Sequence, residues 1–307
     1  MLTGLHALTM PPRLRAGARI ALVSPSGPLR NAADVDRAVA NARDMSWEPV
    51  VGARALARAG YFAGSDAERL SDLQWAIDDE DIDGIWCIRG GYGAARLLSA
   101  LDVDSLHTRP KALIGYSDIT ALHSAWQRIG LTSFHGPTAR AELTVFSRES
   151  FARTVSQAAD ATGAMPQART LRAGTATGRL AGGNLALVAS LCGTHWAIDF
   201  ADTIVVLEDI NEATYRLDRM LLQLRLAGAF DRCAGLLLGQ FTDCPPDSDD
   251  GARSLGDIMQ EFADSVGVPA VLGAPVGHVA DQWTLPLGAI ATLVASRCTL
   301  TLHPGTR

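Results

Sequence analysis

The segment Gly115-Tyr116-Ser117-Asp118 is the first place where residue types and position could support chemistry. It directly follows the apolar run Ala112–Gly115 and precedes a helical pattern. A serine at such a junction projects from the carboxyl edge of a parallel sheet, where open α/β sheets bind ligands. The helix start adds free N–H groups and a positive dipole end that favour a developing anion. Ser117 is therefore a candidate nucleophile, although a serine or aspartate here also suits an ordinary helix cap.

The segment Arg89-Gly90-Gly91-Tyr92-Gly93 has a similar setting, since it also follows an apolar run and opens a helical stretch. Its glycines allow a ligand to approach the backbone, and their N–H groups can form an anion-binding concavity. The pattern is not the dinucleotide motif Gly-x-Gly-x-x-Gly. Two consecutive strand-to-helix junctions of this make-up favour a ligand-binding edge over a plain tight turn.

An acid and a histidine follow later in the chain. Glu208 comes directly after the predicted strand Thr203–Leu207, and a carboxylate at a strand end is well placed to orient a histidine. Glu212 is a second candidate for this acid. His278 follows Gly277 in a predicted loop, from which it could act as a general base. Taken alone, the two glutamates could equally be loop acids that cap the next helix, and His278 could equally be a structural histidine.

The elements that must position these residues alternate between strands and helices over residues 1–140. Short apolar runs predict strands at Ile20–Val23, Gly84–Ile88 and Ala112–Gly115, with helical periodicity between them. This alternation predicts an α/β domain with a parallel sheet and helices on both faces.

Residues 141–175 are polar and carry no strong strand signal, so we expect a linker region with room for one helix at its start. A second domain is expected over 176–307. Its predicted elements are the strands Thr203–Leu207, Leu236–Leu238 and Ile290–Val294 and the helix Tyr215–Ala227.

Composition excludes several classes of protein. The 307 residues are 48% hydrophobic and 20% charged, with a formal net charge of -6 and no long run of either sign. This balance is globular and argues against nucleic-acid and anionic-membrane partners. The five cysteines contain no Cys-x-x-Cys pair and are odd in number, which argues against a disulfide framework or structural zinc. The start of the chain is a poor signal peptide, and we expect a cytoplasmic protein.

Taken together, these segments resemble the serine LD-carboxypeptidase family, which includes the microcin C immunity peptidases. Any one motif is weak, but their order and joint presence are specific. The motifs are Gly17–Pro28, Ala63–Asp66, Arg69 with Asp72-Leu73, Arg89–Leu98, Pro110–Leu122, His135–Pro137, Gly182–Leu185, Leu207–Asp209, Tyr215–Leu221 and Gly277-His278.

The resemblance implies a triad of Ser117, Glu208 and His278. It also implies an N-terminal domain similar to class I glutamine amidotransferases and a smaller, strand-rich, swivelling C-terminal domain, with the triad split between them. One departure is the segment Asn211-Glu212-Ala213-Thr214, where the family has a proline-containing turn.

We assign the oxyanion hole to the backbone N–H groups of Gly90, Gly91 and Asp118. Substrate binding is assigned to Arg89, Tyr92, Gly183 and Asn184. No metal or organic cofactor is expected, and the resemblance implies a homodimer.

The implied activity is hydrolysis of the amide between an L-configured centre and a terminal D-amino acid, releasing D-alanine from muropeptide tetrapeptides in cell-wall recycling. A peptidyl-nucleotide amidase of the microcin C type and a non-catalytic peptide-binding protein remain alternatives. An ordinary α/β-hydrolase would show Gly-x-Ser-x-Gly, but Ile119 occupies the place of the final glycine.

Overall fold

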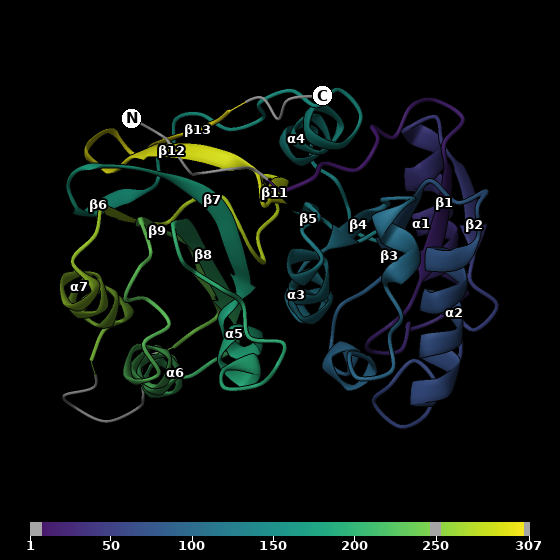
Figure 1. Cartoon of the computed structure of the whole chain (residues 1–307), viewed down its shortest axis with the longest axis horizontal. Helices are drawn as coiled ribbons and strands as arrows, with labels where there is room; N and C mark the ends of the chain where they lie inside the picture. Colours follow the sequence, from purple (N-terminus) through teal and green to yellow (C-terminus); the bar gives the residue numbers. More distant parts are fainter. Residues whose placement is uncertain (1–7, 246–252, 304–307) are drawn as a thin grey trace.

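The computed structural model describes residues 8–245 and 253–303, and these residues form two sheets that lie side by side (Figure 1). The first sheet has the strand order β11-β5-β4-β3-β1-β2, and β1 to β5 pair in parallel. Its strands are β1 (Arg19–Val23), β2 (Glu48–Val51), β3 (Gly84–Cys87), β4 (Ala112–Gly115), β5 (Ser133–His135) and β11 (Leu285–Leu287).

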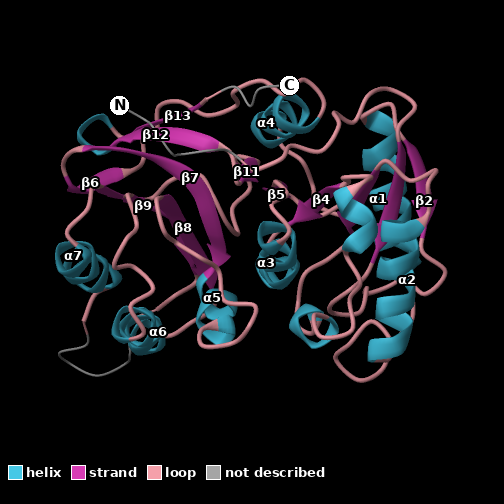
Figure 2. Cartoon of the chain, in the orientation of Figure 1, coloured by secondary structure: helices cyan, strands magenta, loops and turns pink. Residues whose placement is uncertain are grey.

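Helices cover both faces of the first sheet, which confirms the predicted layers (Figure 2). On one face α1 (Ala32–Asp44) and α4 (Val145–Val155) pack over a core that includes Trp86 and Phe151. On the other face α2 (Asp66–Asp78) and α3 (Thr120–Arg128) enclose a second core. The strands β1, β3 and β4 are apolar over nearly their whole length because both of their faces are buried, whereas the edge strand β2 is partly exposed. Short 3-10 helices lie at η1 (Ala94–Leu97), η2 (Asp104–His107) and η3 (Ser117–Ile119).

The second sheet has the strand order β13-β12-β7-β8-β9-β10-β6 and mixes parallel and antiparallel pairs. Three helices pack on one of its faces: α5 (Leu185–Leu191), α6 (Thr214–Leu226) and α7 (Leu255–Val266). Its strands are β6 (Arg169–Arg172), β7 (Thr175–Asn184), β8 (Thr203–Ile210), β9 (Gly235–Thr242), β10 (Ala270–Leu272), β12 (Ile290–Val294) and β13 (Thr299–Leu302), with η4 at Ala295–Arg297.

The structure differs from the sequence-based division of the chain at two strands. β11 belongs to the C-terminal part of the chain, yet it pairs antiparallel with β5, so that Leu285 faces His135 in the first sheet. Within 141–175, the structure has the helix α4, for which the prediction left room at the start of this region, and the strand β6, which we did not predict. β6 is mostly polar and buries only Leu171, because it is an edge strand whose pairing comes from β10. Such an edge leaves little periodic signal in the sequence.

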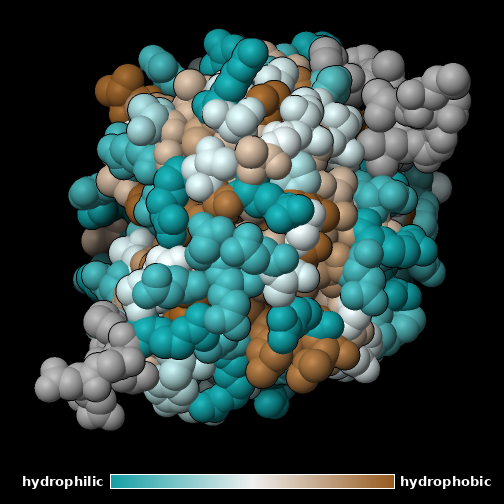
Figure 3. All heavy atoms as spheres, turned by 90° about the vertical axis from the view of Figure 1, so that its left-hand side faces the viewer, coloured by the Kyte–Doolittle hydropathy of each residue, from teal (hydrophilic) through white to brown (hydrophobic). Residues whose placement is uncertain are grey.

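No helix in the described part of the chain combines the length and apolarity needed to cross a bilayer. Seen from the side of the second sheet, the surface is largely hydrophilic, with separate hydrophobic patches (Figure 3).

Candidate active site

Ser117 is the first residue of η3, at the tight turn from β4 into α3. Its φ is +65°, in the left-handed region. An L-residue in this region carries a strain of about 1–2 kcal/mol, which persists only where the surrounding structure imposes it. The turn lifts the side chain out of the sheet edge, as a nucleophile requires.

Gly90 lies directly against Ser117. A Cβ atom added to Gly90 would lie 3.0 Å from Ser117 Cβ and 3.1 Å from Ser117 Oγ. The neighbouring Gly91 has a φ of +120°, and a Cβ there would meet the backbone of Gly27 at 3.0 Å. Glycine is therefore needed at both positions, because the loop after β3 approaches both the serine and the loop after β1 at backbone distance.

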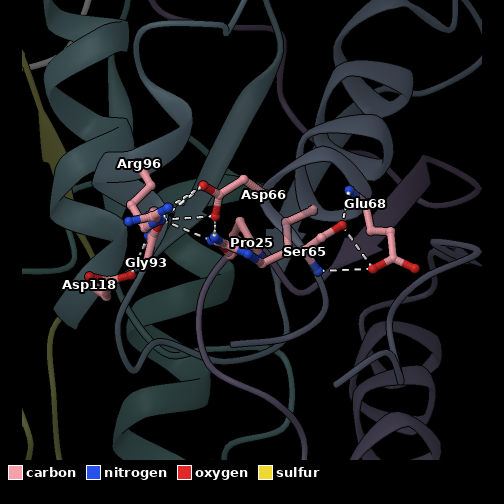
Figure 4. A network of polar contacts seen from close by, with 9 residues as sticks. Pro25, Ser65, Asp66, Glu68, Gly93, Arg96 and Asp118 are labelled. Carbon is pink, nitrogen blue, oxygen red and sulfur yellow. Dashed lines mark hydrogen bonds and ion pairs between the residues drawn. The ribbon is translucent and has the colours of Figure 1, made fainter. Parts of the chain in front are cut away.

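A buried arginine holds these two loops together. Arg69 of α2 is 1% exposed, and its Nη1 donates to the carbonyl oxygens of Pro25 at 2.5 Å and Gly93 at 2.8 Å. Figure 4 shows Pro25 and Gly93 of this network together with Asp66 at the start of α2, which also contacts Arg96. The loops that flank Ser117 are thus anchored to α2 through charge-assisted hydrogen bonds.

The carboxylate of Asp118 reinforces the same loop by accepting the N–H of Ala94 at 2.8 Å. Burial raises the pKa of Asp118. This bond ties the turn that carries Ser117 to the loop that carries Gly90. It therefore fixes the positions of the backbone N–H groups of these two segments relative to each other.

Glu208 and His278 form a hydrogen-bonded pair. Oε2 of Glu208 lies 2.8 Å from Nδ1 of His278, and Glu208 is fully buried. Glu208 lies within β8, which runs on to Ile210, rather than after the strand as the sequence suggested. The register between β8 and β9 shifts between Leu207 and Asp209. Such irregularities re-aim side chains near functional sites.

Two glycines pack against the side chain of Glu208. A Cβ atom on Gly277 would lie 2.7 Å from Glu208 Oε2, and one on Gly239 would lie 3.2 Å from Glu208 Cβ. Oε1 of Glu208 is buried without a hydrogen-bond partner among the described residues. We call the space between Gly277 and Gly239 the Glu208 slot. Glu208 fits in it only because both neighbours are glycines and carry no side chain.

The loop of His278 is fixed by β9. Gln240 N–H donates to the carbonyl of Val276 at 2.9 Å, and Thr242 Oγ1 donates to the carbonyl of His278 at 3.0 Å. The imidazole remains 15% exposed while its acidic partner is closed off from solvent. One ring nitrogen is thus committed to Glu208, and the other is left for chemistry.

Tyr116 joins the histidine to the serine segment. Its ring centroid lies 4.7 Å from that of His278, and it immediately precedes Ser117. Burial, with a smaller contribution from the Glu208 charge, raises the pKa of Tyr116 to about 12. The phenol therefore stays neutral. The histidine, which comes from the second sheet region, therefore lies next to the turn of the first sheet that carries the serine.

Two buried histidines that the sequence did not mark as catalytic lie beneath this turn, although His135 belongs to the motif His135–Pro137. His123 contacts Ser133 Oγ through Nδ1 at 2.9 Å and the carbonyl of Gly115 through Nε2 at 3.0 Å. Burial lowers the pKa of His123 to about 4 and that of His135 well below its ordinary value. Both are neutral. No local signal separates such histidines from catalytic ones, since only burial distinguishes them.

Arg89 and Tyr92 lie at the two ends of the Gly90-Gly91 loop. Arg89 Nη1 donates to the carbonyl of Pro28. Tyr92 is 53% exposed and packs against Tyr61 and Phe62, with ring centroids 5.9 and 5.5 Å apart. Arg89 is thus bound to the loop after β1, and the exposed Tyr92 packs on two aromatic neighbours. Their roles in substrate binding remain predictions.

Gly183 and Asn184 are buried in the scaffold. Asn184 Nδ2 donates to Asp209 Oδ1 at 2.9 Å, and its Oδ1 accepts the N–H of Leu187 at the start of α5. A Cβ atom on Gly183 would lie 2.4 Å from Thr120 Oγ1. The Gly183 contact joins the second sheet to α3, and the Asn184 bonds hold the start of α5 against β8, so we leave both residues out of the substrate contacts proposed below.

Among the described residues, no three His, Cys, Asp or Glu side chains gather in a geometry that could hold a metal ion. All five cysteines are free thiols.

Comparisons with known proteins agree over both sheets. Residues 20–136 match a family model described as the LD-carboxypeptidase N-terminal domain, and residues 177–293 match the LD-carboxypeptidase C-terminal domain. A murein tetrapeptide carboxypeptidase of Pseudomonas aeruginosa is 37% identical over 91% of this chain and 94% of the relative. A probable murein peptide carboxypeptidase of Bacillus subtilis is 31% identical, covering 98% and 97%. The crystal structure of a muramoyltetrapeptide carboxypeptidase from Oxalobacter formigenes is 29% identical with a TM-score of 0.84, covering 93% of this chain and 98% of that chain.

Proposed function

Because the chain belongs to the LD-carboxypeptidase family, we propose that it is a serine peptidase that releases D-alanine from muropeptide tetrapeptides. The observation that carries the proposal is the Glu208–His278 hydrogen bond, with the His278 ring packed at a tilt against Tyr116, beside a serine held at a φ of +65°. The names of the Pseudomonas and Oxalobacter relatives support the substrate class.

In this proposal Ser117 Oγ attacks the carbonyl carbon of the scissile amide, and Nε2 of His278 takes its proton. Nδ1–H of His278 donates to Glu208, which orients the ring and stabilises the imidazolium. The protonated His278 then donates to the leaving amine nitrogen, so D-alanine departs and an acyl-enzyme remains. Water activated by His278 hydrolyses this ester and restores Ser117.

The oxyanion of each tetrahedral intermediate would be bound by the N–H groups of Asp118 and of Gly90 or Gly91. The close approach of Gly90 to Ser117 supports this assignment. Preorganised backbone donors of this kind typically contribute about 10²–10³ in rate each.

Glu208 is preferred over Glu212 as the acid. Glu212 lies before α6 and forms a salt bridge at 3.6 Å with Arg216, whereas Glu208 contacts the imidazole directly. A buried carboxylate also acts on the imidazolium with less dielectric screening.

The free thiols are compatible with the reducing cytoplasm, which is where we place the enzyme. A homodimer remains a prediction that light scattering on the purified protein would test.

The test is incubation of the purified protein with a muropeptide tetrapeptide ending in D-alanine, with D-alanine release followed by mass spectrometry. A tetrapeptide ending in L-alanine and the Ser117→Ala variant are the controls. Release from the D-peptide by the wild type alone supports the proposal. Release by Ser117→Ala would move catalysis elsewhere.

A wild type that binds the peptide without releasing D-alanine would instead indicate a binding protein. Turnover of a peptidyl-nucleotide in place of the tetrapeptide would indicate an immunity peptidase.

A further inference from the structure

Two arginine side chains form hydrogen bonds to consecutive carbonyl groups of the loop after β1. Arg89 Nη1 donates to the carbonyl of Pro28, and Arg58 Nη2 donates to that of Leu29 at 2.9 Å. Neither contact supplies a negative charge. The positive charges of these two guanidinium groups are therefore not neutralised by their hydrogen-bond partners.

Two more arginines meet at Asp34 near the start of α1. The carboxylate of Asp34 accepts Arg140 Nη1 at 3.3 Å and the backbone N–H of Arg30 at 2.9 Å. Desolvation lowers the pKa of Arg89, and the charges of Arg140, Arg30 and Arg58 lower it further. Arg140, Arg30 and Arg58 are thus each within electrostatic reach of Arg89, and Asp34 offsets one of the four positive charges.

The cluster adjoins the proposed nucleophile. Ala139 N–H donates to the carbonyl of Cys87 at 2.9 Å and Arg140 N–H to that of Ile88 at 3.4 Å, so Arg140 lies beside the end of β3. The chain continues from there through Arg89 to Gly90, which touches Ser117. The charge of Arg140 also acts on the phenol of Tyr116.

Arg140 has unused donors. A guanidinium carries five N–H groups, and Asp34 engages Arg140 through Nη1. Nε of Arg140 is buried without a partner among the described residues, while its side chain as a whole is 26% exposed. An anion that reached the exposed part of this guanidinium would meet a charged group that is already partly desolvated, where charge-assisted hydrogen bonds are strongest.

The proposed reaction indicates which anion this is. His278 must protonate the leaving nitrogen, so the leaving D-amino acid lies on the side of His278 and Tyr116, where the charge of Arg140 acts. The carboxylate of that amino acid is only three bonds from the scissile carbonyl carbon, about 4 Å away.

We infer that Arg140, backed by Arg89, Arg58 and Arg30, binds the terminal carboxylate of the substrate and so restricts cleavage to the last residue of a peptide. This inference rests on the proposed function.

The experiment compares a tetrapeptide ending in D-alanine with the same peptide ending in D-alaninamide. The wild type should prefer the free acid about 10- to 100-fold in kcat/KM, as expected for a charge-assisted hydrogen bond. Arg140→Gln should lose most of this preference by raising KM for the acid while leaving the amide nearly unchanged. Arg140→Lys, which keeps the charge, should retain part of it.

Arg148→Gln is the matched control, because Arg148 forms an exposed pair with Asp44 on the outer helices. It should leave the acid-to-amide ratio unchanged. Equal use of acid and amide by the wild type would overturn the inference, as would an equal loss for both substrates in Arg140→Gln together with Arg140→Lys.

Binding to the Ser117→Ala protein separates this inference from the proposed activity. Calorimetry with N-acetyl-D-alanine and its amide reports carboxylate recognition without turnover. Tighter binding of the acid that Arg140→Gln abolishes supports the subsite, even if the wild type releases no D-alanine. Equal binding of the two probes refutes it.

Discussion

Nδ1 of His278 lies 2.8 Å from Oε2 of Glu208, and the two residues come from separate segments of the second sheet region. The bond places the Nδ1 proton on the Glu208 side and leaves Nε2 as the basic nitrogen. Because Glu208 is fully buried, this tautomer is imposed by the fold rather than by solvent.

Replacing Glu208 with glutamine should lower kcat about 10³- to 10⁴-fold. The amide keeps the shape of the carboxylate but can present an N–H to Nδ1, which favours the wrong tautomer and removes the charge that stabilises the imidazolium. Steady-state kinetics of D-alanine release, with circular dichroism to verify folding, measure this effect.

Glu212→Gln is the matched acid-to-amide control. Glu212 is paired with Arg216, while the ring of His278 is hydrogen-bonded to Glu208, so kcat should change less than about twofold, as for a surface substitution. A larger loss in Glu212→Gln than in Glu208→Gln would reassign the acid of the triad.

Replacing Ser117 with alanine should lower kcat about 10⁴-fold or more, because the covalent step is lost. The fold should remain, since alanine fits the same space. Ser117→Gly should be equally inactive but more stable than Ser117→Ala, by up to about 1 kcal/mol, because glycine relieves the strain at a φ of +65°. Urea unfolding of the two variants compares their stabilities. A Ser117→Gly protein that is clearly the less stable of the two would mean that the turn carries no strain.

Gly277→Ala should affect both activity and stability. Its Cβ would lie 2.7 Å from Glu208 Oε2, and its φ of +109° disfavours an L-residue. We expect kcat to fall at least about 10²-fold as the carboxylate is displaced, with a stability loss of about 1–3 kcal/mol.

Gly267→Ala is the control that separates the effect of the positive φ from the effect of the contact with Glu208. Gly267 has a φ of +80° at the end of α7, and a Cβ there would meet no atom within 4 Å. It should lose about 1 kcal/mol of stability with unchanged kcat. If both variants retain full activity, the slot around Glu208 is less rigid than its geometry implies.

The buried His123 should make stability fall in acid. Its folded-state pKa of about 4 lies below the ordinary value of 6.5. Below pH 6.5, His123 therefore binds a proton in the unfolded chain but not in the folded chain. The free energy of unfolding decreases as a result until the pH reaches about 4. The full contribution is on the order of 3 kcal/mol.

Urea unfolding of wild type and His123→Gln between pH 7.5 and 4 measures this contribution. The variant should be less stable at pH 7.5, because its buried partners lose a hydrogen bond, and the difference should close towards pH 4. Comparing the two proteins removes the opposite trend of Asp209, whose pKa burial raises to about 6. Parallel curves over this range would contradict the assignment.

The sequence alone determined the layers of the first sheet and the order of the proposed catalytic residues. Buried parallel strands are continuous apolar runs, and Ser117 lies two residues after the end of the one at Ala112–Gly115, so local pattern was sufficient. The family motifs placed Glu208 and His278 in the same way, by their neighbours in the chain.

Tertiary structure decided the rest. The left-handed turn of Ser117, the glycine-walled slot of Glu208, the pairing of β11 with β5 and the arginine cluster around Asp34 all depend on residues far apart in sequence. A residue's own neighbours do not specify such contacts, because each depends on the backbone path of a distant segment. The physical reason is that strand pairing, close packing and charge proximity are properties of distances in space, which the periodicity of a single segment does not contain.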